Sequence, residues 1–306
     1  MKIGLIAADG HNFPNLALMK ISRFHKAKGD FVEWVNYFER YDKVYMSKVF
    51  TFTPDIYTVI QADEIIRGGT GYDATIRLPL LIEECDPDYS LYPNFPHALG
   101  FITRGCIRKC SWCIVPKKEG EIKPYRHIED ILQDRKSAIL LDNNILSHNV
   151  YAISELQKII DLKIKVDFNQ GLDARLLTDE SAKLLSKIKW IQYIRFAYDT
   201  KEQLTPLLQA IELLNKYGVK NSKIFAYCLL RELEDSYERI NRAKELKITP
   251  FAQPYRDFTS RQIIPQWQLD MARWCNDKAI FKICDFKDYN PRKGFYCREY
   301  FNNYVN

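Results

Sequence analysis

Three cysteines on one short segment carry the most distinctive chemistry of this chain. Cys106, Cys110 and Cys113 stand at C-x3-C-x2-C spacing, directly after the apolar run 98–103, which predicts a buried strand. Three thiolates on one loop can bind three irons of a [4Fe–4S] cube and leave the fourth iron open to a small molecule. Zinc sites usually add a second, distant pair of ligands, and none of the five histidines lies at zinc-like spacing. We therefore expect an iron–sulfur site, with structural zinc or inert thiols as the alternatives.

The cysteine motif, with Trp112 just before its last cysteine, resembles the signature of radical S-adenosylmethionine (radical SAM) enzymes. The flanks Ile-Thr-Arg-Gly and Ile-Val-Pro are similar to the branch of methylthiotransferases and cobalamin-domain enzymes. The resemblance implies a [4Fe–4S] cluster on Cys106, Cys110 and Cys113 that cleaves SAM reductively, so that the resulting radical abstracts hydrogen from a substrate. Methylthiotransferases proper need three more cysteines before the barrel, and only Cys85 precedes the loop.

The elements predicted around the motif suit the fold that this resemblance implies. Apolar or β-branched runs predict strands at 98–103, 138–141, 165–168, 191–197, 223–230 and 248–253. Helical patterns lie between them at 127–135, 151–162, 178–188, 201–217 and 233–246. We expect a partial (β/α)6 radical SAM barrel over residues 98–257, with active-site residues at the carboxyl ends of its strands.

The end of the second predicted strand is a candidate SAM-binding segment. Asp142, Asn143 and Asn144 stand where the family commonly has a motif that contacts the amino group of SAM. The Gly-Gly-Glu letters of that motif are absent, so the match is one of position. Trp112 is a further candidate cofactor-binding residue, because it lies within the cysteine loop itself.

The segment after the third predicted strand looks like the Q-G-L-D-x-R segment of cobalamin-domain radical SAM enzymes. From this likeness we expect Gln170 or Asp173 to accept hydrogen bonds from the ribose of SAM. Arg175 would then face the SAM carboxylate as a bidentate donor. Each of these residues could instead be a surface salt-bridge partner.

Arg195 and Asp199 flank the end of the fourth strand, and Tyr227 begins the segment whose backbone would hold the adenine. Arg195 and Tyr227 are therefore candidate cofactor-binding residues. An N-cap of the helix starting near Thr200 explains Asp199 at least as well as a role in binding does.

Before the barrel, residues 1–84 predict a small Rossmann-like domain with a parallel sheet. The strands are expected at 2–7, 31–35, 43–46 and 64–66, with a helix at 15–28. This domain looks like a degenerate cobalamin-binding domain, whose motif is D-x-H-x-x-G. Asp9 and His11 match it, but Pro14 replaces the glycine, and the domain leaves little room for a corrin. We therefore do not expect cobalamin, and keep His11 as a cobalt ligand as the alternative.

The remaining segments are a proline-rich linker at 85–97 and a helical or irregular extension at 258–306. A helix at 265–276 is expected to close the barrel mouth. The extension contains three cysteines, for which buried thiols are the simplest interpretation: Cys275, Cys284 and Cys297. An auxiliary cluster would need a fourth thiolate, from Cys228 or Cys85.

The extension also interleaves aromatic and basic residues, among them Tyr296, Tyr300, Tyr304 and Arg298. Such a pattern could stack and neutralise a nucleic acid, although packing over the barrel rim explains it equally well. The rival hypothesis is therefore a non-catalytic iron–sulfur or zinc protein that binds nucleic acid.

Basic residues surround the cysteine loop, although the net charge of the chain is only +6. This basic collar consists of Arg104, Arg108, Lys109, Lys117, Lys118 and Lys123. It could dock an acidic electron donor of flavodoxin or ferredoxin type, serve a phosphate-bearing substrate, or simply be a solvated loop.

The composition, 46% hydrophobic and 27% charged, is typical of a soluble globular protein. No apolar run approaches the roughly 20 residues of a membrane span, so we expect no membrane partner. Without an export signal, the eight cysteines are expected to be reduced and the protein cytoplasmic. The substrate is open among RNA bases, peptides and small metabolites.

Overall fold

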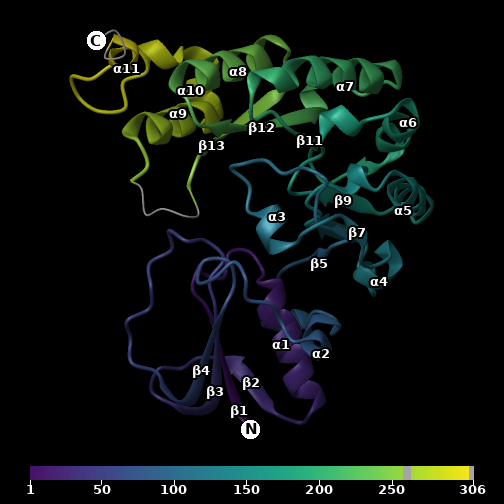
Figure 1. Cartoon of the computed structure of the whole chain (residues 1–306), viewed down its shortest axis with the longest axis vertical. Coiled ribbons are helices and arrows are strands. Elements are labelled where there is room, and N and C mark those ends of the chain that lie inside the picture. Colours follow the sequence, from purple (N-terminus) through teal and green to yellow (C-terminus); the bar gives the residue numbers. More distant parts are fainter. Residues whose placement is uncertain (258–262, 303–306) are drawn as a thin grey trace.

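The computed structural model describes residues 1–257 and 263–302. Figure 1 shows a parallel sheet with the first helix at one end of the molecule and a larger α/β unit at the other. The helix α3 (Val115–Lys118), which follows the cysteine loop, lies between them. Residues 258–262 and 303–306, including Tyr304 of the predicted extension, lie outside the described residues.

The amino-terminal sheet has four parallel strands in the order β2-β1-β3-β4. Its strands are β1 (Lys2–Ala7), β2 (Phe31–Trp34), β3 (Arg40–Ser47) and β4 (Gln61–Gly68). Helix α1 (Leu16–Ala27) joins β1 to β2 and begins at Asn15, whose side chain accepts a hydrogen bond from the Leu18 amide. The short α2 (Leu80–Glu83) packs against α1. This is the small Rossmann-like sheet expected from the sequence.

Gly4 allows an unusual connection in this sheet. The five residues 35–39 join β2 to β3 and must pass β1, which lies between those two strands. A Cβ atom at Gly4 would lie 2.6 Å from the side chain of Val35, so only glycine lets the connection pack this closely.

The barrel consists of six parallel strands in chain order. They are β5 (Ala98–Gly100), β8 (Ser137–Leu140), β9 (Lys165–Phe168), β11 (Ile194–Ala197), β12 (Ile224–Leu230) and β13 (Thr249–Pro254). Hydrogen bonds join the first three strands and the last three, and a parallel bridge between Leu172 and Phe196 connects the two sets. The partial (β/α)6 barrel is thereby confirmed, with the short β10 (Lys189–Trp190) added beside β9.

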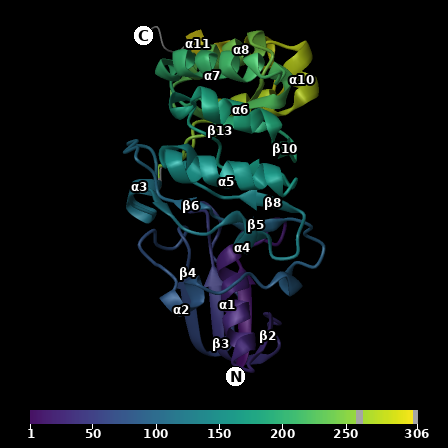
Figure 2. The ribbon, with the colours of Figure 1, turned by 90° about the vertical axis from the view of Figure 1, so that its right-hand side faces the viewer.

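Helices cover the outer face of the barrel (Figure 2). They are α4 (Ile128–Leu132), α5 (Asn149–Asp161), α6 (Asp179–Lys187), α7 (Leu204–Lys216), α8 (Leu233–Glu245) and α9 (Gln266–Asn276). Beyond them lie α10 (Lys278–Ile283) and α11 (Glu299–Asn302). The period of two along β11 and β12 turns Phe196, Ala226 and Cys228 into the buried core, so Arg195 and Tyr227 face the barrel interior.

The first barrel strand is shorter than predicted. It ends at Gly100, and the chain then turns into β6 (Thr103–Arg104), which pairs antiparallel with β7 (Lys123–Pro124). The apolar run continues to Thr103, but the buried Asp142 accepts hydrogen bonds from the Ile102 and Thr103 amides and holds the turn. In the described part of the chain, no helix has the length and apolarity needed to cross a membrane.

Candidate cofactor site at the barrel mouth

The cysteine loop lies between β6 and α3 and is closed at its base by ion pairs. Arg104 donates from Nε and Nη2 to both carboxylate oxygens of Glu119, over 2.8 and 3.0 Å. The Cys106 amide donates to the Gly120 carbonyl over 3.2 Å. Gly105 has φ +90°, and a Cβ atom there would lie 2.1 Å from the Glu121 carbonyl oxygen. The three cysteines therefore sit on a loop whose two ends are fixed together.

All three thiols of the loop are free. Cys113 is exposed as a whole residue, but its thiol is partly buried. Burial raises the pKa of both Cys110 and Cys113, so without a metal the neutral thiol is favoured. Among the described residues, only His127, Glu129 and Glu155 bring three ligand atoms within 4.8 Å of one another. The three thiols thus do not converge on one point as ligands of a single ion would, whereas a cube spreads its ligands over separate irons.

Two of the predicted SAM-binding residues, Asp142 and Asn143, accept hydrogen bonds from the segment just before Cys106. The Asp142 carboxylate is buried and also accepts a hydrogen bond from Thr103 Oγ1 over 2.7 Å. Burial raises the pKa of Asp142 to about 6 against these hydrogen bonds. Asn143 Oδ1 accepts from the Gly105 amide over 3.0 Å. Both side chains are turned toward the backbone that positions Cys106, and their contact with SAM remains a prediction.

Asn144 faces the first cysteine directly. Its Nδ2 lies 3.4 Å from Cys106 Sγ and 3.5 Å from Asp173 Oδ2. Its Oδ1 is buried and has no hydrogen-bond partner among the described residues. A buried acceptor without a partner costs free energy, so this oxygen suits a donor supplied by a bound molecule.

Asp173 and Arg175 are brought together beside Asn144, as a pair. Arg175 donates from Nε to Asp173 Oδ1 over 2.6 Å, and Arg108 donates to Asp173 Oδ2 over 3.0 Å. Burial alone would raise the pKa of Asp173, but these two guanidinium groups outweigh it and lower the pKa. Gln170, in the turn before them, is exposed. The structure therefore joins Cys106, Asn144, Asp173 and Arg175 in one network at the carboxyl edge of the barrel.

Arg195 and Tyr227 form a second group, on the inner wall of the barrel. Arg195 donates two hydrogen bonds to the buried Asp167, over 2.7 and 2.6 Å. Its Nη1 lies 3.3 Å from the Tyr227 hydroxyl, which donates to the Asn169 carbonyl over 2.7 Å. Sequence reasoning missed Asp167, because it stands within a predicted strand and not at its end.

Two further residues reach the cysteine loop from the later strands. The Arg231 guanidinium lies 4.5 Å from the centre of the Trp112 ring, a cation–π contact that connects the end of β12 to the loop. Asp199 does not cap the helix after β11, because Thr200 and Gln203 form the capping box there. Instead Asp199 Oδ1 accepts from the Leu229 amide. Burial is the main reason that the pKa of Cys110 and Cys113 is raised, and the nearby Asp199 adds to it.

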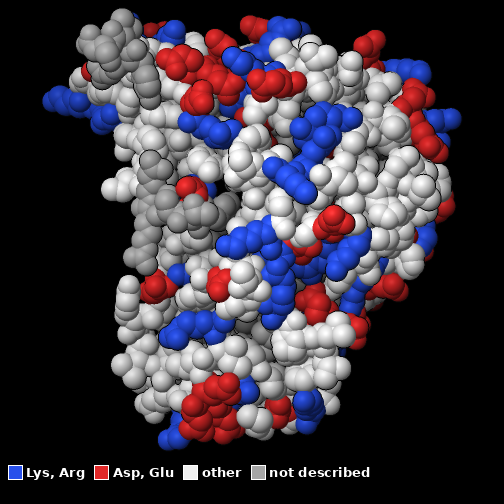
Figure 3. Space-filling model, viewed as in Figure 1, with Lys and Arg blue, Asp and Glu red and all other residues white. Residues whose placement is uncertain are grey.

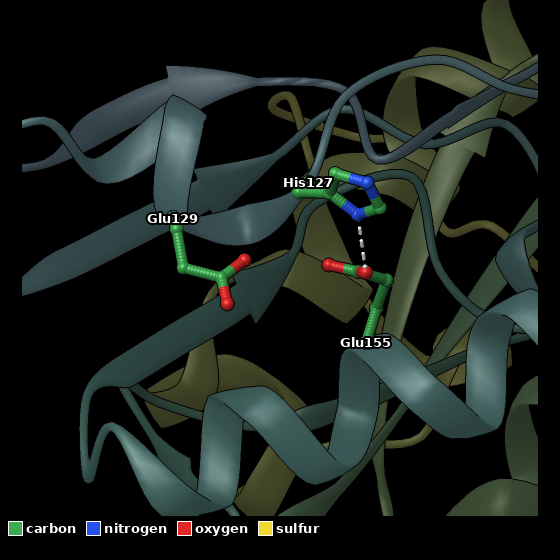
Figure 4. A group of neighbouring side chains, drawn as sticks. All are labelled: His127, Glu129 and Glu155. Carbon is green, nitrogen blue, oxygen red and sulfur yellow. Dashed lines mark hydrogen bonds and ion pairs between the residues drawn. The ribbon is translucent and has the colours of Figure 1, made fainter.

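The group His127, Glu129 and Glu155 lies on the outer side of the barrel and has a structural role (Figure 4). His127 Nδ1 and Glu155 Oε1 are 2.8 Å apart, and the other Glu155 oxygen accepts from the Ile128 amide at the start of α4. Lys158 Nζ lies within 3.2 Å of all three side chains. An ammonium group therefore already occupies the position that a metal cation would take.

The residues that match the cobalamin motif serve local structure. Asp9 accepts hydrogen bonds from the Val49 amide over 2.6 Å and from the Phe50 amide over 3.3 Å. The His11 ring packs edge-on against Trp34, with 4.3 Å between ring centres. These contacts join the loops at the carboxyl end of the amino-terminal sheet.

Among the described residues of the carboxyl-terminal extension, Phe295, Tyr300 and Phe301 pack against the hydrophobic core, whereas Tyr296 is exposed. Arg292 lies over the Phe295 ring at 3.8 Å and donates to the buried Asp270, which also accepts from the Tyr300 hydroxyl. Cys228, Cys275 and Cys297 belong to the hydrophobic core. Packing therefore explains the positions of these three cysteines and of Arg292, Phe295 and Tyr300. The structure gives no separate support to an auxiliary cluster or to a nucleic-acid surface among the described residues.

Comparison with known proteins points to one superfamily. No protein-family model matches the chain. The ribosomal protein uS12 methylthiotransferase RimO of Aromatoleum aromaticum is 24% identical over 115 residues, which cover 37% of this chain and 25% of the relative. RimO of Pseudomonas aeruginosa is 26% identical over 118 residues, covering 37% and 26%. The chain thus spans about a quarter of the length of the curated relatives it matches.

The fold is similar to that of a solved radical S-adenosylmethionine methyltransferase. This protein, TsrM from Kitasatospora setae, was solved with cobalamin and a [4Fe–4S] cluster bound. The TM-score is 0.60 at 12% identity, and the match covers 81% of this chain and 73% of that chain. The sequence and fold comparisons together support the assignment that the cysteine motif suggested.

Proposed function

We propose that this protein of the radical SAM superfamily is an enzyme that binds a [4Fe–4S] cluster through Cys106, Cys110 and Cys113. The cluster would supply the electron for reductive cleavage of SAM, followed by hydrogen abstraction from a substrate. The observation that carries the proposal is the closed loop of three free thiols with Asn144 aimed at Cys106.

The chain's own residues have distinct tasks in this proposal. Arg104 and Glu119 hold the ends of the cysteine loop together, and Asn144 Nδ2 donates to the Cys106 sulfur. The unpartnered Asn144 Oδ1 suits an ammonium donor such as the amino group of SAM. Arg175 lies beside it and presents a cation near the same edge, where a carboxylate would be stabilised.

The inner wall of the barrel would orient the adenine of SAM or the substrate. Arg195 is held by Asp167, and the rings of Phe225 and Tyr227 stand 5.0 Å apart at that wall. Aromatic rings and a fixed cation suit a planar base or a polar substrate group. The substrate itself is not identified by these groups.

The first prediction concerns the cluster ligands. After anaerobic reconstitution, the wild-type protein is expected to hold about four irons with matching sulfide and to form 5′-deoxyadenosine with dithionite and SAM. Cys106→Ala should lose most of the iron and all of this product. Cys85→Ala is the matched control, because the Cys85 thiol donates to the Leu81 carbonyl and takes no part in the cysteine loop, and this variant should behave as wild type.

Metal analysis of the same samples distinguishes the proposed enzyme from the rival hypothesis of a non-catalytic zinc protein. One zinc per chain in place of iron would favour the non-catalytic zinc protein. A fully loaded wild-type cluster that cleaves no SAM with any reductant would rule out the proposed catalysis.

An acidic electron donor of flavodoxin or ferredoxin type is the partner that we propose. Figure 3 shows Lys and Arg side chains gathered across the middle of one face, around the region of α3. Opposite charges steer association, and salt screens them. Reduction by a flavodoxin should therefore slow steeply with ionic strength, while reduction by dithionite serves as the control for the chain itself.

Cobalamin-dependent catalysis is a second candidate, favoured by the fold similarity to a protein solved with cobalamin. The local roles of Asp9 and His11 give it no further support. A spectral shift of hydroxocobalamin on mixing, lost in His11→Ala, would support this candidate. No shift with the wild-type protein would dismiss it.

A further inference from the structure

A cavity of about 510 Å³ lies between the amino-terminal sheet and the barrel, apart from the network around Cys106. Its walls come from α1, from the carboxyl ends of β3 and β4, from residues 76–83 and from the β6–β7 hairpin. Most of the lining is apolar, and it includes Leu16, Ile21, Ile66, Leu78, Ile82 and Phe101. The volume is in the range of small-molecule sites, which is roughly 300–1,000 Å³.

The charged groups that line this cavity are mostly cations. Of its carboxylates, Glu83 pairs with Lys20 and Arg104, and Glu119 pairs with Arg104. Four more cations line the cavity, and none of them forms an ion pair with a carboxylate among the described residues: Arg67, Arg77, Lys118 and Lys123. Burial and the nearby Arg77 lower the pKa of Lys118, and the carboxylates of Glu119 and Asp73 offset this only in part.

We propose that this cavity binds a small anionic amphiphile, with an apolar body against the α1 wall and a phosphate or carboxylate group at the four cations. An apolar cavity with a few convergent polar groups is the usual form of such a site. The opposite charge of the ligand would relieve the repulsion among the cations. The cavity shares Arg104 and Glu119 with the base of the cysteine loop, but Cys106, Asn144, Asp173 and Arg175 do not line it. The inference therefore does not depend on the proposed catalysis.

The test uses the full chain and the fluorescent anionic probe anilinonaphthalene sulfonate. Saturable binding with one probe per chain is expected. Octyl phosphate and octanoate should displace the probe, whereas octyltrimethylammonium, which has the wrong charge, and inorganic phosphate, which lacks an apolar body, should not. The phosphate and carboxylate arms identify the preferred head group.

Two variants locate the site. Ala17→Trp places a large ring in the cavity and should abolish binding, while Ala27→Trp, exposed at the end of the same helix, should not. The double change Arg67→Glu and Lys123→Glu should weaken probe binding about tenfold or more, against no change in Lys183→Glu on α6. Undiminished binding to Ala17→Trp, or equal displacement by the octyl cation and anions, would overturn the proposal. If a variant does not fold, the displacement series on the wild-type chain still tests whether the cavity prefers anionic amphiphiles.

Discussion

At Asn144, one amide side chain meets both the cysteine loop and the Asp173–Arg175 pair. Nδ2 lies near Cys106 Sγ and Asp173 Oδ2, and Oδ1 is buried without a partner. A donor to a ligating sulfur stabilises the reduced, more negative cluster, as outer hydrogen bonds do in iron–sulfur proteins. In the proposed enzyme, one uncharged side chain would thus contact both a cluster ligand and the bound SAM.

Asn144→Leu should therefore lower the reduction potential of the reconstituted cluster. One hydrogen bond contributes about 0.5–1.5 kcal/mol, so the expected change is about 20–65 mV for one electron. A redox titration followed by electron paramagnetic resonance measures it. The control is Asn149→Leu, at an exposed position on α5, and equal potentials in all three proteins would refute this role.

The ion pair between Arg195 and Asp167 on the inner wall of the barrel allows a test of its contribution to stability. Arg195→Met leaves the buried Asp167 carboxylate without its bidentate partner and should lower the free energy of unfolding by about 3–5 kcal/mol. Replacing both residues, with Asp167→Leu added, should recover most of that loss. Urea unfolding measures both variants, and a double variant less stable than the single one would contradict the argument.

The cysteines could be proposed as cluster ligands from the sequence because iron ligation would restrict both the residue type and the spacing. The Asp167–Arg195 pair could not be recognised from the sequence, because its members are 28 positions apart on neighbouring strands. Asp142 was placed at the correct strand end, but its hydrogen bonds to the Ile102 and Thr103 amides follow from a turn that hydrophobic periodicity does not reveal.

Among the elements, the linker before the barrel is fastened to α1 by a buried carboxylate. Asp88 accepts hydrogen bonds from Ser22 Oγ over 2.6 Å and from the Ser90 amide over 3.0 Å, and pairs with Lys26 over 2.7 Å. Burial would raise the pKa of Asp88, but these partners outweigh it and lower the pKa to about 2. The predicted linker therefore carries a fixed contact to the amino-terminal sheet unit.

The lowered pKa of Asp88 gives a pH prediction with a definite sign. Its stabilisation is fully present above the ordinary pKa of 3.8 and is lost as the pH falls toward about 2. Asp88→Asn should cost about 2 kcal/mol near neutral pH, and its difference from wild type should vanish toward pH 2. Unfolding measured over this pH range checks it, and a difference that does not shrink in acid would contradict it.

Most elements were predictable because strand and helix periods differ and caps are local. The strand over Lys165–Phe168 and the Thr178 cap of α6 are where the pattern indicated. The strand predicted over 191–197 begins three residues later, because Lys189–Trp190 pairs with β9 instead. Which segments pair as strands depends on residues far apart in the sequence, and the local hydrophobic pattern does not show this.

At the scale of the whole molecule, Arg104 connects the amino-terminal sheet unit to the cysteine loop. Its guanidinium pairs with Glu83 of α2 over 2.6 Å and with Glu119 at the far end of the loop. Lys20 of α1 and Tyr125 of the barrel meet at the same Glu83. No sequence pattern reveals this junction, because its members are spread over more than a hundred residues.

Arg104→Met should release both contacts at once. Hydrogen exchange over residues 105–120 is expected to quicken about tenfold or more, because local opening no longer breaks the pair with Glu119. Arg126→Met is the matched control, since Arg126 pairs with the exposed Asp86 at the same junction. Equal exchange in both variants would show that Arg104 does not hold the loop.

The clamp between Arg104 and Glu119 also bears on how the protein matures. Because side chains of the protein close the base of the loop, we expect the polypeptide to fold before the proposed cluster is inserted. Cys113 is the most exposed of the three cysteines and would be the most accessible ligand of the proposed cluster. In the proposed enzyme, the cluster would then be inserted late, into a loop that the protein has already closed.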